Sequence, residues 1–326
     1  MKLTTTGVEA YNAKYIRMSE LKIQKSDPEW MLKGFYYSLI VKNSYKTAYE
    51  YLASVASFLK EMEVTPKTVD VDDYFEYMAR LKTKSASCQR GMYHALKKYS
   101  RYLKAKNICE DYMEYIERPK DFETQETIEK REVGFLTKSE AKKLLNSTIS
   151  DPCKSDTIKA RNYAIMMIFL TTGIRCSALY KLDLGNIDLE KKTITTHEKG
   201  NKYRVVNIPD QTVEAINIWL GYRKEYLGDK YDQEDALIIS THKRRMESES
   251  IYVLIKKIGK IITGKNITPH KLRATYGTQL YNKTRDLYFV QACMGHANPK
   301  TTEIYIRGQK NELSAKAASL MGSFLE

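Results

Sequence analysis

A polar segment in the middle of this chain separates two stretches with different hydrophobic patterns, and this division limits the possible folds more than any other feature. The segment, residues 118–127 (RPKDFETQET), has a proline near its start and no apolar periodicity. Before it, apolar residues recur at helical spacing, whereas after it helical segments surround a pair of strands. A chain of 326 residues is long enough for two such domains. The boundaries that we expect are an N-terminal extension at 1–27, a helical domain at 28–118, a linker at 119–134 and a mixed domain at 135–326.

The first domain is expected to be helical throughout. Periodic segments run over 45–62 and 71–81, and Thr65-Pro66 restarts the chain between them. A further helix over about 87–104 places apolar residues on one face and cations on the opposite face. The apolar face carries Met92, Leu96, Tyr99 and Leu103, and the cationic face carries Arg90, Lys97, Arg101 and Lys104.

The cationic face of that helix lies in a stretch with nine cations and no acid between residues 80 and 106. Solvated helix faces usually mix both signs of charge. A uniformly positive face opposite an apolar face therefore favours contact with phosphate groups. An ordinary surface helix is the alternative interpretation.

The second domain is expected to mix helices with a β-hairpin. Residues 192–197 and 203–209 have the composition of strands, and Gly200-Asn201 between them is typical of a hairpin turn. Apolar periodicity predicts helices at about 138–147, 157–170, 210–226 and 250–262, the first of them capped by Thr137. A second stretch without acids runs from residue 250 to 285 and holds eight cations.

The net charge of +14 suggests a polyanionic partner, although charge alone identifies none. Residues 1–118 carry 20 Lys and Arg against 15 Asp and Glu, residues 119–134 carry 3 against 5, and residues 135–326 carry 31 against 20. No apolar run is long enough to span a bilayer, and the N-terminus lacks the apolar core of a signal peptide. The five cysteines form no CxxC pair, which argues against a disulfide framework or a zinc site. We therefore expect a cytoplasmic protein.

Six candidate residues are weak evidence when each is taken alone. Arg175 follows a glycine turn, Lys199 lies at the expected hairpin tip, and His270 and Arg273 share one face of a helix that begins after Thr268-Pro269. Each of them is also compatible with an ordinary surface position. Their order is more specific, because His296 lies 23 residues after Arg273 and Tyr305 lies 9 residues further on.

The ordered set resembles the complete active-site signature of the tyrosine recombinase (integrase) family. Residues 172–175 (TGIR) are similar to its T-G-x-R box, 199–206 (KGNKYRVV) to its β-hairpin lysine motif, 268–275 (TPHKLRAT) to its second-arginine box, and 294–297 (MGHA) with 301–305 (TTEIY) to its C-terminal box. The resemblance covers about 135–310 tightly and 28–118 loosely, where residues 43–49, Tyr99 and Tyr102 are the comparable positions. It implies a mainly helical protein, with a SAM-like core-DNA-binding domain followed by a catalytic α+β domain with a small antiparallel sheet.

The resemblance also implies a role for each residue in DNA cleavage without metal, ATP or any other cofactor. Tyr305 is the expected nucleophile, and its phenol, with a pKa of about 10 when unperturbed, needs nearby cations to lower that value. Arg175 and Arg273 suit the phosphate oxygens because the planar guanidinium stays charged and binds in a bidentate manner. Lys199 is the expected general acid for the leaving 5′-oxygen. His270 is the expected base, and His296 is expected to donate to the phosphate.

One position departs from the family pattern, and one alternative chemistry is disfavoured. The family usually has an acid three residues after the first arginine, whereas this chain has Ala178 there, so Arg175 lacks an expected partner. His270 and His296 could be metal ligands, but no Cys, Asp or Glu stands beside them at ligand spacing, and nearby arginines would repel a cation. We therefore expect no metal.

The implied partners are a double-stranded DNA recombination site and further copies of the chain, assembled as a homotetramer on DNA from a monomer or weak dimer, with no membrane involved. The stretch 311–326 has apolar residues at helical spacing and is expected to dock either on a neighbouring copy or on its own domain.

Two alternatives stay open, a type IB topoisomerase and a DNA-binding protein that has lost catalysis. The roughly 25 residues before the helical lobe favour a simple recombinase without an arm-binding domain. The sequence leaves the DNA site undetermined, as it does the choice among integration, excision, resolution and inversion.

Overall fold

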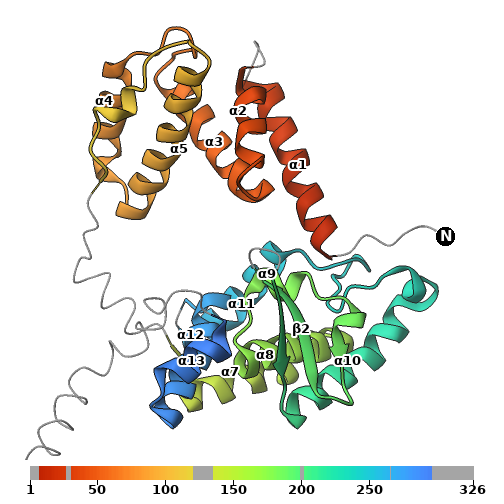
Figure 1. Cartoon of the computed structure of the whole chain (residues 1–326). Helices are drawn as coiled ribbons and strands as arrows, with labels where there is room; N and C mark the ends of the chain where they lie inside the picture. Colours follow the sequence, from red (N-terminus) through yellow and green to blue (C-terminus); the bar gives the residue numbers. More distant parts are fainter. Residues whose placement is uncertain (1–6, 27–30, 120–134, 199–201, 265, 296–326) are drawn as a thin grey trace, which may run out of the picture. The chain divides into compact units, whose positions relative to one another are not determined.

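The structure, a computed structural model, describes residues 7–26, 31–119, 135–198, 202–264 and 266–295. Its described part separates into two compact units, one within Val8–Thr124 and the other within Gln125–Glu326. The first unit is entirely helical and the second combines helices with a small sheet (Figure 1). This architecture confirms the predicted fold class.

The first unit includes a helix from residues 1–27, which were expected to form a separate extension. Its elements are α1 (Gly7–Ser26), α2 (Met31–Ile40), α3 (Tyr45–Glu61), α4 (Val71–Arg80), η1 (Leu81–Thr83), α5 (Ala86–Ala105) and η2 (Tyr112–Glu114). Local capping explains several of the boundaries. Ser44 caps α3 by accepting from the backbone N–H of Thr47, and Asp70 and Asp73 form a capping box at the start of α4.

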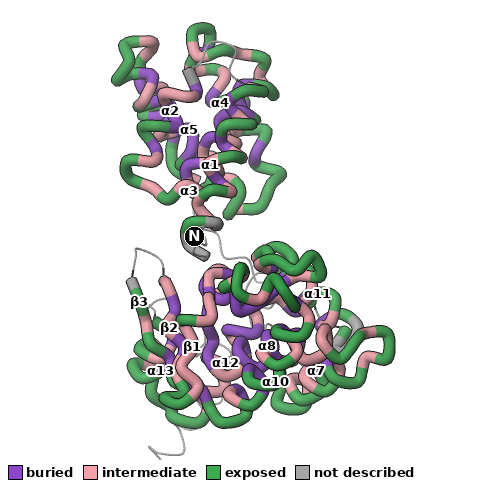
Figure 2. Tube along the Cα trace, turned by 90° about the vertical axis from the view of Figure 1, so that its right-hand side faces the viewer, coloured by how far each residue is buried: buried purple, intermediate pink, exposed green. Residues whose placement is uncertain are grey.

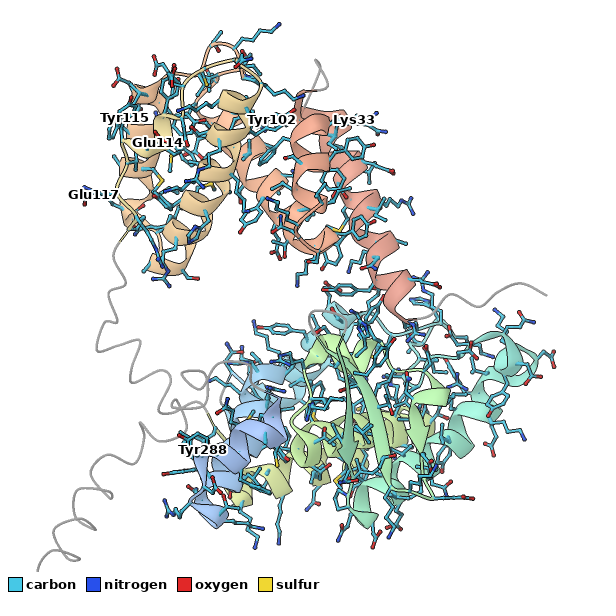
Figure 3. All side chains as sticks on the ribbon, in the orientation of Figure 1. Lys33, Tyr102, Glu114, Tyr115, Glu117 and Tyr288 are labelled. Atoms are coloured by element: carbon cyan, nitrogen blue, oxygen red, sulfur yellow. The ribbon has the colours of Figure 1, made fainter. Side chains whose placement is uncertain are left out.

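Helix α5 packs its predicted apolar face into the core of the first unit. Leu96 and Leu103 are fully buried, and Tyr99 is 1% exposed. Helices α2 and α3 pack against α5, and the Phe35 ring on α2 lies 5.2 Å from the ring of Tyr99. Tyr102 points between α5 and α2, where its hydroxyl stands 2.3 Å from the place that a Cβ on Gly34 would occupy (Figure 3). The two tyrosines that we compared with the family are therefore packing residues of this unit.

The second unit is built around α8, which is buried along most of its length (Figure 2). Its elements are α7 (Lys138–Ser150), α8 (Asp156–Thr172), α9 (Cys176–Tyr180), η3 (Leu184–Asn186), β1 (Ile187–Asp188), β2 (Thr193–Glu198), β3 (Lys202–Asn207), α10 (Asp210–Leu227), η4 (Gly228–Gln233), α11 (Ser248–Thr263), α12 (Pro269–Thr284) and α13 (Leu287–Met294). Helices α7, α10 and α12 all pack against α8. Because α8 carries apolar residues on all sides, burial from several directions is its stable arrangement.

Within the described residues the sheet has three antiparallel strands in the order β1-β2-β3. The predicted hairpin is present, and its register pairs Thr193 with Asn207 and Glu198 with Lys202. The strand β1 was not predicted, because two residues carry no detectable periodicity. Ile194 and Val206 face the core, whereas Tyr203 and Val205 on the edge strand are exposed.

Candidate active site

The first arginine box lies at a sharp turn between α8 and α9. Gly173 ends α8 in the left-handed conformation, with φ of 58°, and its N–H donates to the carbonyl of Phe169 at 3.0 Å. Two residues later, Arg175 is the N-cap residue of α9 and its side chain is half-buried. The ring of Tyr276 on α12 covers this turn so closely that a Cβ on Gly173 would stand 2.4 Å from its Cδ1 atom. Glycine is thus required here for its backbone conformation and for the approach of Tyr276.

The second arginine box begins α12 as predicted. Thr268 accepts a hydrogen bond from the backbone N–H of Lys271, and Pro269 occupies the first turn. His270 and Arg273 follow on this helix, His270 exposed and Arg273 only 3% exposed. The box is also tied to the start of the unit, because the N–H of Leu136 donates to the hydroxyl of Thr275 at 2.9 Å.

The Arg273 guanidinium joins three of the sequence boxes. Its Nη1 donates to the carbonyl of Gly173 in the first arginine box, and its Nη2 donates to the carbonyl of Met294 at 2.6 Å. Met294 is the first residue of the C-terminal box and the last residue of α13. A buried guanidinium whose two terminal nitrogens donate to carbonyls of different segments has a fixed orientation.

His270 lies within the electrostatic reach of both arginines. Desolvation by surrounding protein lowers the pKa of its imidazole, and the positive charges of Arg273 and Arg175 lower it further. His270 is exposed overall, yet both causes lower its pKa, because a nearby cation and a loss of water each disfavour imidazolium. A neutral imidazole beside two guanidiniums is able to accept a proton.

The structure therefore brings together Arg175, His270 and Arg273 of the six predicted catalytic residues. The other three, Lys199, His296 and Tyr305, lie outside the described residues, as do residues 311–326. Glu198 and Lys202 form the last described pair of the hairpin before Lys199. Ala178, which stands where the family usually has an acid, is 1% exposed on α9.

Sequence reasoning missed Arg204, which lies on β3 and reaches a distant element. Its Nη1 donates to the carbonyl of Cys293 at 2.6 Å, in the last turn of α13. The only sequence signal was its place in the hairpin lysine motif, and a cation on a strand does not reveal which backbone it contacts. Cys293 also escaped notice, because its contribution to this contact is a backbone carbonyl.

The predicted cationic face on α5 has acidic neighbours from the segment that follows the helix. Arg101 Nε lies 3.4 Å from a carboxylate oxygen of Asp111, whose side chain is 1% exposed, and Lys104 Nζ lies 3.5 Å from Glu110. Lys97 Nζ donates to the hydroxyl of Tyr93 at 3.2 Å and also lies over its ring. Arg90 is half-buried. Arg101 and Lys104 remain exposed, so the face is positive but partly neutralised at one end.

The described residues provide neither a membrane span nor a metal site. None of the helices in that part of the chain is long and apolar enough to cross a membrane. No group of three or more His, Cys, Asp or Glu within the described ranges is arranged to hold a metal ion.

Comparison with known proteins identifies the family of the chain. The sequence profile of the phage integrase family matches residues 134–312, which is more than half of the chain and includes all six predicted catalytic positions. The chain therefore belongs to the phage integrase family, the tyrosine site-specific recombinases, which are enzymes that cleave and rejoin DNA.

Individual relatives fall in the same family. The chain is 31% identical over 222 residues to the tyrosine recombinase XerD of Chlamydia trachomatis, covering 68% of this chain and 71% of that protein. It is 33% identical over 258 residues to the tyrosine recombinase XerC of Caldanaerobacter subterraneus, covering 76% of this chain and 67% of that protein.

Solved structures share the fold. The XerH site-specific recombinase bound to a palindromic difH substrate, in a post-cleavage complex, matches with a TM-score of 0.64 and 20% identity, covering 98% of both chains. A lambda integrase dimer bound to a COC′ core site matches with a TM-score of 0.61 and 16% identity, covering 84% of this chain and 75% of that one. At these identities the likeness concerns the fold.

Proposed function

We propose that this chain cleaves and rejoins double-stranded DNA at a specific site through a 3′-phosphotyrosyl linkage to Tyr305. The observation that carries the proposal is the hydrogen bonding of Arg273 to Gly173 and Met294, which gathers the two arginine boxes and the start of the C-terminal box at one place. Breaking a phosphodiester bond without a metal ion needs positive charge held rigidly beside the phosphate. Buried, doubly bonded Arg273 with half-buried Arg175 nearby meets that requirement.

Each residue then has a separate part in the reaction. Arg175 and Arg273 stabilise the negative charge that develops on the non-bridging oxygens of the scissile phosphate. His270 accepts the Tyr305 proton, and the lowered pKa of its imidazole keeps it neutral and ready to do so near pH 7. Lys199 donates a proton to the leaving 5′-oxygen, and His296 donates to the phosphate.

The proposed reaction conserves the energy of the phosphodiester bond. Attack by the Tyr305 oxygen on phosphorus forms a phosphotyrosyl bond and releases a 5′-hydroxyl. A 5′-hydroxyl from a partner strand then attacks that linkage, which reseals DNA and releases the tyrosine. Each step replaces one phosphate ester bond with another, so the reaction needs neither ATP nor a divalent cation.

We further propose that the chain acts as a homotetramer on DNA and that Arg90, Lys97, Arg101 and Lys104 contact phosphates. The structural relatives named above were solved on DNA recombination sites, which supports DNA as the partner. Two biological roles fit this reaction, the integration or excision of a mobile element and the resolution of DNA dimers. The similarity to relatives named XerC and XerD favours a simple recombinase of the Xer type.

The test is a covalent trap in EDTA. Nicked duplexes with a randomised central region are incubated with the protein, so that cleavage releases a short fragment and prevents rejoining. We expect wild type to form a protein–DNA adduct on a denaturing gel and Tyr305→Phe to form none. Tyr288→Phe is the matched control, because this tyrosine of α13 is 82% exposed and points away from the unit (Figure 3).

Sequencing the trapped DNA would reveal the target site. An adduct that persists in Tyr305→Phe would exclude this tyrosine as the nucleophile. An adduct that forms only without EDTA would exclude the metal-independent reaction. DNA binding by wild type with no adduct on any sequence of the pool would instead favour a DNA-binding protein that has lost catalysis.

A further inference from the structure

Two arginines from different elements hold the last two carbonyls of α13. Arg204 Nη1 donates to the carbonyl of Cys293 and Arg273 Nη2 donates to the carbonyl of Met294, each at 2.6 Å. The last carbonyls of a helix have no partner within the helix, and they form the negative end of its dipole. Two guanidiniums therefore stabilise this end both as donors and as charges.

Arg204 also packs against the residue that ends α13. Gly295 has φ of 62°, and a Cβ at this position would stand 3.1 Å from Nε and 3.2 Å from Cδ of Arg204. The flat side of the Arg204 side chain thus lies against Gly295, while its Nη1 donates to the carbonyl of Cys293 in α13. A lysine would keep the charge and could still donate a hydrogen bond, but it would lack the planar group that covers Gly295.

The backbone of Arg204 belongs to the strand that follows Lys199. Arg204 pairs with Thr196 across the β2–β3 hairpin, and the Thr196 hydroxyl donates to its carbonyl at 3.2 Å. Gly295, on the other side of the contact, directly precedes His296 in the sequence, and Tyr305 follows ten residues after Gly295. Arg204 therefore connects the hairpin of the general acid to the start of the segment that carries the nucleophile.

We propose that Arg204 is a positioning residue, which fixes the end of α13 and thereby the start of the segment that presents His296 and Tyr305 to the scissile phosphate. The proposal rests on the function proposed above. It assigns to Arg204 an effect on nucleophilic attack through Cys293 and Gly295, and no contact with DNA. It also explains why one turn of backbone is held from two sides, by Arg273 at Met294 and by Arg204 one residue earlier.

The test compares two substrates that differ in the leaving group. One is the nicked duplex identified by the covalent trap, and the other replaces its 5′-bridging oxygen with sulfur. A thiolate leaves without a proton, because thiol pKa values lie near 8.5, whereas an alkoxide needs a general acid. Sulfur therefore restores cleavage when the general acid is missing and leaves a defect in nucleophile placement uncorrected.

We expect Lys199→Ala to be slow on the oxygen substrate and restored by sulfur. Arg204→Ala is expected to cleave about 10- to 100-fold more slowly on both substrates, which is the effect of losing one charge-assisted hydrogen bond. Arg204→Lys should recover part of this loss, and DNA affinity should match wild type in both variants. Val205→Ala is the matched control, because its side chain is exposed on the same strand, and it should cleave at the wild-type rate.

Three results would overturn the proposal: wild-type cleavage by Arg204→Ala, restoration of this variant by sulfur to the same extent as Lys199→Ala, or a parallel loss of DNA affinity. If Arg204→Ala fails to fold, the test uses Arg204→Lys instead. Slow cleavage of the oxygen substrate by this variant, restored on the sulfur substrate, would assign Arg204 to the general-acid step and overturn the proposal. The proposed function fails separately, through adducts that do not depend on Tyr305.

Discussion

Arg273 donates a hydrogen bond from Nη1 to the carbonyl oxygen of Gly173, one hundred residues earlier in the chain. The acceptor is the residue that ends α8, two positions before Arg175. The guanidinium of one predicted phosphate ligand therefore holds the turn from which the other predicted ligand projects. Arg273 therefore supports the position of Arg175, in addition to supplying its own positive charge.

This relationship predicts different consequences for the two arginines. Arg175→Ala and Arg273→Ala should both abolish cleavage, because each removes positive charge from the phosphate site. Arg273→Ala should in addition lower the free energy of unfolding by about 2 kcal/mol or more, since it leaves the carbonyls of Gly173 and Met294 without their donor. Urea unfolding measures the second effect. DNA binding should be retained by Arg175→Ala, and its loss in parallel with cleavage would contradict the assignment to the chemical step.

Gly173 itself gives the second prediction. Gly173→Ala should destabilise the protein for two reasons, the left-handed backbone, at about 1–2 kcal/mol, and the overlap with the Tyr276 ring, at about 1–3 kcal/mol more. Gly264→Ala is a matched control. Gly264 also ends a helix in the left-handed conformation, with φ of 67°, but a Cβ there would meet nothing within 4 Å.

The difference between these two variants in urea unfolding isolates the contact with Tyr276. Equal destabilisation would mean that the ring moves aside freely. Because Gly173 also accepts from Arg273, cleavage should fall in Gly173→Ala and stay at the wild-type rate in Gly264→Ala.

Much of the fold followed from local patterns in the sequence. Thr268-Pro269 predicted the start of α12, Thr137 predicted the cap of α7, and apolar spacing predicted which face of α5 is buried. Each of these features depends on residues within one or two helical turns of one another. The composition of residues 192–197 and 203–209 likewise predicted the two paired strands of the hairpin.

Long-range contacts were not predictable in the same way. The placement of Glu110 and Asp111 beside the cations of α5 depends on how the chain folds back after the helix, and helical periodicity contains no information on that path. The bonds from Arg204 and Arg273 end on backbone carbonyls, which every residue has, so no side-chain pattern marks the acceptor. The order of the motifs indicated that these segments meet, but it did not indicate which atoms make the contact.

The lowered pKa of His270 predicts a dependence of stability on pH. The folded protein holds the neutral imidazole more strongly than the unfolded chain does, so protonation favours unfolding. The contribution is favourable above the ordinary histidine pKa of about 6.5 and is lost as pH falls below it. Wild type should therefore lose more stability between about pH 7.5 and pH 5.5 than His270→Asn.

Urea unfolding at the two pH values measures this difference. His242→Asn, at an exposed histidine in a loop of the same unit, is the control and should behave like wild type. If His270→Asn and wild type lose the same free energy, protonation of His270 is not coupled to folding.

The cations of α5 give the last prediction, and the structure changes how it must be tested. Arg101→Ala should destabilise the first unit by about 1–3 kcal/mol, because it leaves the buried Asp111 carboxylate without its nearby counter-charge. Lys104→Ala should change stability by about 0.5 kcal/mol or less, since both Lys104 and Glu110 are exposed.

DNA contact is therefore better tested with Lys97→Ala and Lys104→Ala, which should each flatten the dependence of log affinity on log salt by about 0.9 if the lysine contacts a phosphate. Lys191→Ala, an exposed cation of the second unit paired with Asp188 at 2.8 Å, is the control. An unchanged slope in the two α5 variants, with intact folding, would place this face in solvent.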